Sequence, residues 1–424
     1  MRRFPRTARR ARLRASALAT LLLLGCGART SLSESAGVPA TDGGEPLVAH
    51  DAGGPGASRG AADGEAHASD AGTVDAGTGD AGTGDADLGP GDASACGSGE
   101  RTLASTGQNQ PTGLAIDANN VYWTDGESVR KVPLCGGKPT LLASDSATFG
   151  AGALAVDSGH LYWLTSSYAA DGGASESTVV KMRISGGAPI TLAAAQAPSW
   201  LVVDSTSAYW TDIGVDDSDC TVMKVPITGG AATTLVSGQV SPDGIGGLAL
   251  DAAYVYWTTG GPATATNGGA VVKAPIGGGA PTTLATGQYP GALAVDDTHV
   301  YWVNTLCAPP NDGGAECTEN AIVSVPLGGG APTTLASGEG QGEQIALDAV
   351  NVYWTTSSRD NSQFGMGPVL VVPKAGGTPA TLASGQYDPT GIAVNENSAV
   401  WLSAGLSNAQ GTVTGASVME VTPK

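Results

Sequence analysis

The stretch Gly113-Leu-Ala-Ile-Asp117, followed by Val121-Tyr122-Trp123-Thr124-Asp125, decides the fold of this chain because its pattern recurs along the sequence. One tryptophan marks each copy, and a tyrosine precedes it in every copy except the last, where Val400 stands. The spacing between successive tryptophans is 40 to 52 residues, a period typical of repeat architectures. The seven are Trp123, Trp163, Trp210, Trp257, Trp302, Trp354 and Trp401.

Each repeat contains four short segments rich in β-branched, aromatic and apolar residues, with turn residues between them. The first two resemble 113–117 and 121–123, the third resembles 222–226, and the fourth resembles 332–337. This composition predicts strands. Paired glycines such as Gly229-Gly230 join the third and fourth segments and supply the positive φ that tight hairpins need. Each repeat is therefore predicted to be a four-stranded antiparallel sheet.

The first two segments of each repeat are apolar on both sides, so both faces of each sheet must be covered. Radial packing of the sheets achieves this and predicts an all-β propeller of seven four-stranded blades over residues 96–424. The seventh repeat ends at Lys424 after its third strand, whereas an extra strand at 101–105 precedes the first repeat. We expect this strand to complete the last blade and close the ring, which removes open sheet edges.

The segments Tyr122-Trp123-Thr124-Asp125 and Tyr209-Trp210-Thr211-Asp212 resemble the YWTD repeats of low-density-lipoprotein-receptor-like ectodomains. The resemblance covers residues 101–424 and implies a β-propeller, but it says little about function because propellers have many functions. YWTD propellers have six blades, so six blades are the alternative to the seven counted here. Most copies also lack the final Asp, as at Thr259 and Asn304.

Residues 1–25 are predicted to be a lipoprotein signal peptide. Seven arginines precede the apolar stretch 17–24, which is too short to span a bilayer because about 18 apolar residues are needed. Leu23-Leu24-Gly25-Cys26 resembles the lipobox of bacterial lipoproteins, which implies lipidation of Cys26. An ordinary signal peptide is the alternative. Gly27, in place of Asp, resembles the sorting signal for the outer membrane, so we expect a lipid-anchored protein of the cell envelope.

Residues 26–95 are predicted to form a disordered acidic tether. The segment is rich in Gly, Ala, Asp, Ser and Thr and contains no Trp, Tyr or Phe, so it cannot bury enough apolar surface to fold. Removal of the signal peptide would leave 13 basic and 39 acidic residues. This balance argues against nucleic acid as a partner, and against any membrane contact other than the lipid anchor.

The remaining five cysteines predict two disulfides. Cys307 and Cys317 lie in one insertion, and Cys96 and Cys135 would lie on neighbouring blades of a closed ring. The cell envelope permits such bonds. Cys220 is left over and is expected to be a free thiol, with an intermolecular bond as the alternative. Neither Cys-x-x-Cys nor paired histidines are present, so no metal site and no cofactor are expected.

The candidate binding residues fall into two groups. The channel mouth of a propeller is lined by the starts of the first strands, and among mostly small residues there Trp200, Glu343 and Gln344 stand out. The connections between the second and third strands grow long in repeats two to seven, and loops on a rigid scaffold commonly carry recognition. Plausible contacts in these loops are Tyr168, Asp216, Arg359 and Phe364.

These observations favour a non-enzymatic binding module for a protein or glycan at the loop-bearing face. The alternative is a metal-assisted hydrolase or lyase at the channel mouth, which rests on fold analogy and on Glu343, and one carboxylate does not make a metal site. A purely structural envelope component is a third interpretation. A glutamine recurs after the fourth strand and is expected to satisfy backbone groups, at Gln108, Gln196, Gln239, Gln288 and Gln386.

Overall fold

The structure is a computed structural model that describes most of the chain from residue 98 to residue 424. The predicted signal peptide, Cys26 and the tether lie outside the described residues, as do several connections within the repeats. These connections are 108–110, 145–152, 167–176, 213–219, 240–244, 261–267, 308–316, 339, 358–364 and 408–412.

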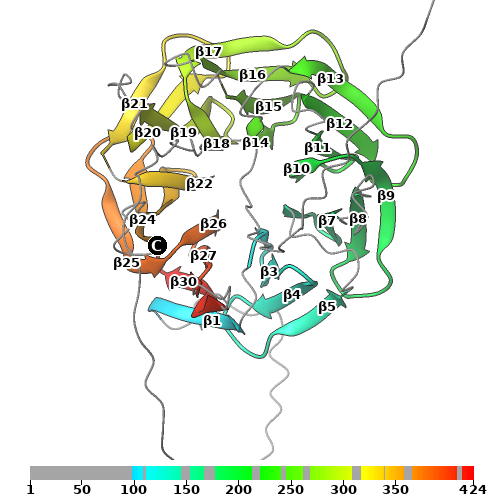
Figure 1. The fold of residues 1–424 in the computed structure, drawn as a ribbon. Coiled ribbons are helices and arrows are strands. Elements are labelled where there is room, and N and C mark those ends of the chain that lie inside the picture. Colours follow the sequence, from blue (N-terminus) through cyan, green and yellow to red (C-terminus); the bar gives the residue numbers. More distant parts are fainter. Residues whose placement is uncertain are drawn as a thin grey trace, which may run out of the picture. The chain divides into compact units, whose positions relative to one another are not determined.

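Seven four-stranded antiparallel sheets stand around a central axis as the blades of a propeller (Figure 1). Blade 1 consists of β2 (Leu114–Ile116), β3 (Asn120–Thr124), β4 (Ser128–Pro133) and β5 (Thr140–Ser144). Blade 2 consists of β6 (Leu154–Val156), β7 (His160–Ser166), β8 (Ser177–Arg183) and β9 (Ile190–Ala195). Blade 3 consists of β10 (Pro198–Val203), β11 (Ser207–Asp212), β12 (Cys220–Pro226) and β13 (Thr233–Gln239).

The remaining blades repeat this order. Blade 4 consists of β14 (Ile245–Leu250), β15 (Tyr254–Thr259), β16 (Gly269–Pro275) and β17 (Thr282–Gln288). Blade 5 consists of β18 (Pro290–Val295), β19 (His299–Cys307), β20 (Cys317–Pro326) and β21 (Thr333–Ser337). Blade 6 consists of β22 (Gln341–Leu347), β23 (Asn351–Ser357), β24 (Met366–Pro373) and β25 (Ala380–Tyr387). A two-stranded hairpin of β28 (Leu406–Ser407) and β29 (Val413–Thr414) lies outside the seven sheets.

Blade 7 closes the ring with strands from both ends of the described chain. It consists of β26 (Pro389–Val394), β27 (Ala399–Ser403), β30 (Ala416–Thr422) and β1 (Gly99–Gly107), and β1 pairs antiparallel with β30. The predicted closure by strand 101–105 is confirmed, although the strand extends two residues further at each end. The blade count of seven is also confirmed, and the alternative of six is wrong.

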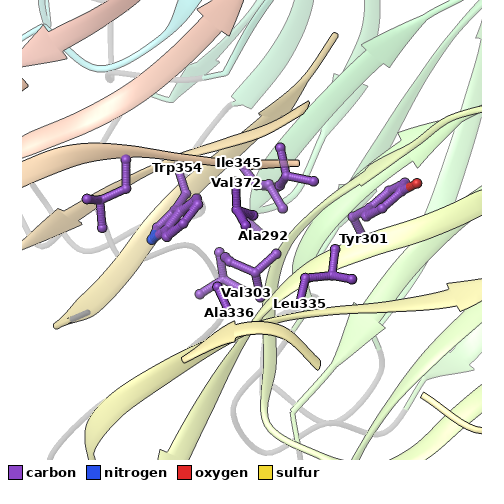
Figure 2. Close-up of a cluster of buried hydrophobic side chains, with 11 residues drawn as sticks. Ala292, Tyr301, Val303, Leu335, Ala336, Ile345, Trp354 and Val372 are labelled. Atoms are coloured by element: carbon purple, nitrogen blue, oxygen red, sulfur yellow. The ribbon is translucent and has the colours of Figure 1, made fainter. Parts of the chain in front are cut away.

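The Tyr-Trp pair is buried on both sides because successive residues of a strand point to opposite faces. Seven hydrophobic clusters fill the spaces between neighbouring blades. In the cluster between blades 5 and 6, Tyr301 and Val303 of β19 meet Ile345 and Trp354 of blade 6 (Figure 2). The sheet face that carries the tyrosine, or Val400 in blade 7, thus packs against the next blade, and the face that carries the tryptophan packs against the previous one.

The recurring Asp after the first strand holds the following turn and the tyrosine together. In blade 3, Asp204 Oδ1 accepts hydrogen bonds from the backbone N–H groups of Thr206 and Ser207, and Oδ2 accepts one from the Tyr209 hydroxyl. Burial, followed by the hydrogen bond to Asp204 and the charge of Asp204, raises the pKa of Tyr209 to about 12. Blade 7 replaces both partners, with Asn395 and Val400, so the turn is kept where no phenol needs an acceptor.

A cation bridges each pair of neighbouring blades. In blades 1 to 4 a lysine opposite the tyrosine donates to a backbone carbonyl of the next blade, as from Lys273 Nζ to Leu327 O at 2.6 Å. In blade 5 the residue opposite the tyrosine is Ser324. Here Lys374 of blade 6 instead donates a hydrogen bond to Asp296 of blade 5. Lys424 does the same for Asp348 of blade 6. Between blades 7 and 1, Arg101 pairs with Glu420 and donates to a carbonyl of blade 1.

The described residues bear on the predicted cysteine pairs without testing either pairing. The register places Cys307 directly opposite Cys317. Cys135 takes part in a disulfide bond. Both pairings, Cys307 with Cys317 and Cys96 with Cys135, therefore stay predictions. Cys220 is buried and is not disulfide-bonded, as expected.

Candidate functional site at the channel mouth

The ring has two different faces, which follow from the antiparallel order of the strands. We call the face that carries the second-to-third and fourth-to-first connections the loop face; the short connection 196–197 between β9 and β10 is an example. The opposite face carries the other turns and is called the turn face. The inner strands β2, β6, β10, β14, β18, β22 and β26 contact one another around the channel, and those labelled in Figure 1 lie nearest its centre. By the same strand order, each inner strand begins at the loop face.

The structure brings three of the predicted contacts to this channel. Trp200 lies on β10, and Glu343 and Gln344 lie on β22; all three are half-buried. The loop residues Tyr168, Asp216, Arg359 and Phe364 lie outside the described residues, so their role stays a prediction. The candidate site described below therefore rests on the inner strands and on the connections next to them.

Trp200 is built into the channel rather than held out toward solvent. Its side chain packs against the cluster between blades 3 and 4 and also against the cluster between blades 5 and 6, so it extends across the channel. Its indole Nε1 donates to the carbonyl of Ile245 at 3.1 Å, and its backbone N–H donates to Thr211 Oγ1. The one side-chain donor of Trp200 is thus already used, and its contact with a ligand stays a prediction.

The threonine of the repeat draws the inner strands together near the mouth. Thr258 Oγ1 donates to Gly291 O of the next blade at 2.8 Å, and Thr355 Oγ1 donates to Thr390 O at 2.8 Å. A Cβ on Gly247 would lie 2.8 Å from the Leu293 side chain, so only glycine permits this approach of β14 to β18. The channel wall is consequently rigid and narrow on this side.

The last residue of the repeat motif fixes the fourth-to-first connections of the loop face. Asp212 accepts hydrogen bonds from the backbone N–H groups of Gln196 and Ala197 at 2.9 and 2.7 Å. In blade 5, Asn304 Oδ1 accepts the same kind of bond from the N–H of Tyr289. An amide oxygen serves as well as a carboxylate here, which explains why the final Asp is not required in every copy.

Two carboxyl groups, those of Glu343 and Asp388, interact electrostatically at the mouth between blades 6 and 7. Glu343 Oε1 accepts a hydrogen bond from Ser357 Oγ at 2.6 Å. Asp388 precedes β26 with a φ of 45°, and its backbone bonds to Gly365 O and to the N–H of Ala404. Burial, and then the negative charge of Glu343, raise the pKa of Asp388 to about 6. A carboxyl group with this pKa can give or take a proton near neutral pH.

The sequence analysis identified Glu343 but missed Asp388. Its position directly before Pro389 and β26 was an available signal, because this is a fourth-to-first connection that leads into the channel wall. Nothing in the sequence indicated that Asp388 is half-buried or that its carboxyl group interacts with the charge of Glu343. In the described ranges no cluster of three or more His, Cys, Asp or Glu side chains is arranged to hold a metal ion. These ranges also contain no helix long and apolar enough to cross a membrane.

Comparisons with known proteins identify the fold and no family. No protein-family model and no curated protein matches the chain. A manganese-bound oligogalacturonate lyase matches with a TM-score of 0.52 and 13% identity, over 78% of this chain and 94% of that one. The GH74 enzyme of Niastella koreensis matches with a TM-score of 0.52 and 14% identity, over 72% of this chain and 52% of that one. A chain of a nidogen/laminin complex matches with a TM-score of 0.40 and 19% identity, over 54% of this chain and 80% of that one. At such identities the likeness shows a shared propeller fold alone.

Proposed function

We propose that this chain is a lipid-anchored envelope protein whose propeller binds a protein or glycan ligand at its loop face without catalysing a reaction. The observation that carries the proposal is the position of Trp200 in the channel. Trp200 crosses it and is hydrogen-bonded to Ile245, while the threonine bonds tie neighbouring inner strands together. Such a ring supports loops on a rigid platform and offers little room for a substrate within the channel.

The proposed location follows from the sequence. The lipobox-like segment ending at Cys26 would anchor the chain, and the acidic segment up to residue 95 would let the propeller stand away from the membrane. Without the signal peptide the chain has 13 basic and 39 acidic residues. This excess of negative charge favours solubility and disfavours anionic ligands. We therefore expect a neutral or cationic ligand, and no cofactor.

The experiment is a binding and turnover screen with the full chain carrying Cys26→Ser, which prevents lipidation. Immobilised protein is tested against a glycan array and by cross-linking in intact cells, and each ligand found is then incubated with the protein and analysed for chemical change. The proposal predicts at least one saturable ligand that is recovered unchanged. Conversion of the ligand, or the lack of any saturable ligand, contradicts it.

A second candidate function, hydrolysis or elimination at the channel mouth, is favoured by one observation. The charge of Glu343 helps raise the pKa of Asp388 to about 6, and a carboxyl group with a raised pKa is typical of acid–base sites. Asp388→Asn and Glu343→Gln test it directly. Loss of turnover in both variants with unchanged ligand affinity would replace the binding proposal with a catalytic one.

A further inference from the structure

Asp388 stands where two long connections of the loop face meet. It lies between β25 and β26, and its φ of 45° is in the left-handed region. Its backbone N–H donates to Gly365 O at 2.8 Å, at the end of the connection between β23 and β24. Its carbonyl accepts a hydrogen bond at 3.1 Å from the N–H of Ala404, which precedes the hairpin of β28 and β29. One residue thus holds the bases of the second-to-third connections of blades 6 and 7.

The residue before Asp388 adds to the same set of contacts. Tyr387 O accepts hydrogen bonds from Ser403 Oγ at 2.8 Å and from the N–H of Gly405 at 3.4 Å. A Cβ on Gly405 would lie 2.5 Å from Thr414 O, so this segment also lies tightly against the end of the hairpin. We call this set of residues the blade 6–7 junction: 365, 387, 388 and 403–405.

The carboxyl group of Asp388 is packed into the junction. A Cβ built on Gly365 would lie 3.1 Å from the Asp388 Cβ and 3.3 Å from its Oδ1, so the side chain lies directly beside the backbone of the blade 6 connection. In the equivalent connection between blades 4 and 5, Tyr289 directly precedes Pro290. Asp388 is inserted between the corresponding tyrosine and proline, so the carboxyl group is an addition that the equivalent connection does without.

A second carboxyl group acts on Asp388 from the inner strand of blade 6. Glu343 of β22 is held by the hydrogen bond from Ser357 Oγ, at the end of β23. Burial, and then the charge of Glu343, disfavour the ionised form of Asp388 and raise its pKa to about 6. The half-buried carboxylate would regain water if the junction opened.

The other elements around the junction carry few charges in the described residues. Glu100 of β1 accepts a hydrogen bond from Gln386 Nε2 at 2.9 Å, and the segment 403–416 contains no charged side chain. Arg359 and Asp360 belong to the connection between β23 and β24 and lie outside the described residues. The charge from β22 is therefore the one that acts on this carboxyl group in the described part of the chain.

We propose that Asp388 is a pH-sensitive latch of the loop face: its protonated carboxyl group keeps the blade 6–7 junction closed, and loss of the proton loosens it. Ionisation places a second negative charge near Glu343 in a half-buried position, and opening relieves this cost by solvating the carboxylate. A carboxyl group whose pKa is raised in the closed state favours closure most at low pH and loses this effect as the pH rises from about 4 to about 6. Acidification would therefore stiffen the bases of both connections.

Hydrogen exchange of the Ala404 and Gly405 amides measures opening of the junction without any ligand. The exchange is followed by NMR in the full chain carrying Cys26→Ser and is divided by the chemical exchange rate at each pH. Raising a pKa from about 3.9 to about 6 corresponds to roughly a hundredfold in an equilibrium. We expect the ratio of open to closed junction to rise at least tenfold between about pH 4.5 and pH 7. The amide of Ile276, which donates to Ala253 O on the turn face, should show no such rise.

Three variants make the test specific. Asp388→Asn keeps the side-chain size and tolerates a positive φ, but it cannot ionise, so its exchange should not depend on pH beyond the chemical rate. Glu343→Gln removes the neighbouring charge and should reduce the rise without abolishing it, because burial still acts on Asp388. Glu127→Gln removes an exposed carboxyl group from the short loop-face connection of blade 1 and should leave the full rise.

The outcomes separate this inference from the proposed function. No rise in the wild type, an equal rise in Asp388→Asn, or a rise at Ile276 as large as that at Ala404 each overturns the latch. If Asp388→Asn fails to fold, Glu343→Gln decides, and a rise equal to that of the wild type overturns the proposal. The inference goes beyond ligand binding, so a pH-independent junction leaves the proposed function standing, and a ligand that is chemically converted leaves the latch standing.

Discussion

Replacing Lys374 tests how the blades are held together. Lys374 Nζ lies 2.7 Å from Asp296 Oδ2 and 5.5 Å from the centre of the Tyr301 ring, so one cation serves two groups of the neighbouring blade. Lys374→Met removes the cation and keeps most of the apolar stem. The position opposite Tyr301 is Ser324, whereas in blade 4 the position opposite Tyr256 is Lys273. Adding Ser324→Lys to the Lys374→Met variant therefore recreates the arrangement of blade 4.

The expected magnitude follows from the burial of the pair. The side chains of Lys374 and Asp296 are 17% and 18% exposed. An exposed ion pair contributes about 0–1 kcal/mol, whereas breaking a buried pair costs about 3–5 kcal/mol. The contact with the tyrosine ring adds about 0.5–1 kcal/mol. We expect Lys374→Met to lower the free energy of unfolding by about 2–3 kcal/mol. The second substitution should recover about half of this loss, because the new lysine can donate to a backbone carbonyl as Lys273 does.

The effect has a defined pH dependence. Burial alone would raise the pKa of Asp296, but the hydrogen bond from Lys374 and those from Thr298 and His299 outweigh it and hold the pKa well below its usual range. A carboxyl group with a lowered folded-state pKa stabilises the fold above its unfolded pKa of about 3.9 and loses this contribution at lower pH. The difference in the free energy of unfolding between the wild type and Lys374→Met should therefore be constant from pH 7 to about 5 and should shrink below about pH 4.

Urea unfolding of the single and double variants measures these differences, with Lys138→Met as the control for loss of an exposed lysine. Ser324→Lys in the wild-type background should destabilise the protein, because two lysines would then compete for one interface. A cost below about 1 kcal/mol for Lys374→Met would show that the pair behaves as an exposed one. A double variant no more stable than the single one would refute the equivalence of the two lysine positions.

Three further predictions concern the closure, the inner rim and the channel mouth. Arg101→Met should cost about 3–5 kcal/mol in urea unfolding because it leaves Glu420, which is 0% exposed, unpaired; adding Glu420→Met should restore most of this, and a cost under about 1 kcal/mol would contradict the role of the pair. Gly342→Ala should cost about 1–3 kcal/mol because its Cβ would lie 2.6 Å from Val303 Cγ1, whereas Gly277→Ala, with nothing within 4 Å, should be nearly neutral. Asp388→Asn should raise stability by about 1–2 kcal/mol above pH 6 and not below pH 4, because a raised folded-state pKa lowers stability as pH rises through this range; equal stability of both proteins at pH 4 and pH 8 would refute the raised pKa of Asp388.

The fold was predictable because its signals are local and repeated. The tryptophan spacing gave the blade count, and the unpaired strand before the first repeat indicated the closure. The turn aspartates and their tyrosines are five residues apart, so their association is visible in the sequence once the structure explains it. The recurring glutamines were predicted to satisfy backbone groups. Gln239 and Gln386 do so through their amide nitrogens, but their oxygens also accept the indole N–H of the next blade.

The features that were missed depend on contacts between distant residues. Lys374 replaces a lysine that would otherwise stand at Ser324, fifty residues earlier, and only the packing of blade 6 on blade 5 reveals the exchange. Asp388 became a candidate because it is half-buried and within the electrostatic influence of Glu343, which no local pattern indicates. Trp200 was expected to contact a ligand, which stays a prediction, but its packing against two clusters on different sides of the channel was not visible in the sequence.

Comparing ligand affinity between the two faces of the ring tests the central claim most directly. Tyr387 is 39% exposed at the loop face, and Val350 is 64% exposed in a first-to-second turn on the turn face. Each is replaced by arginine in the full chain carrying Cys26→Ser, and both variants are titrated with the ligand found in the screen. Our account predicts at least tenfold weaker binding for Tyr387→Arg and unchanged binding for Val350→Arg. Unchanged binding for Tyr387→Arg together with weaker binding for Val350→Arg would contradict it.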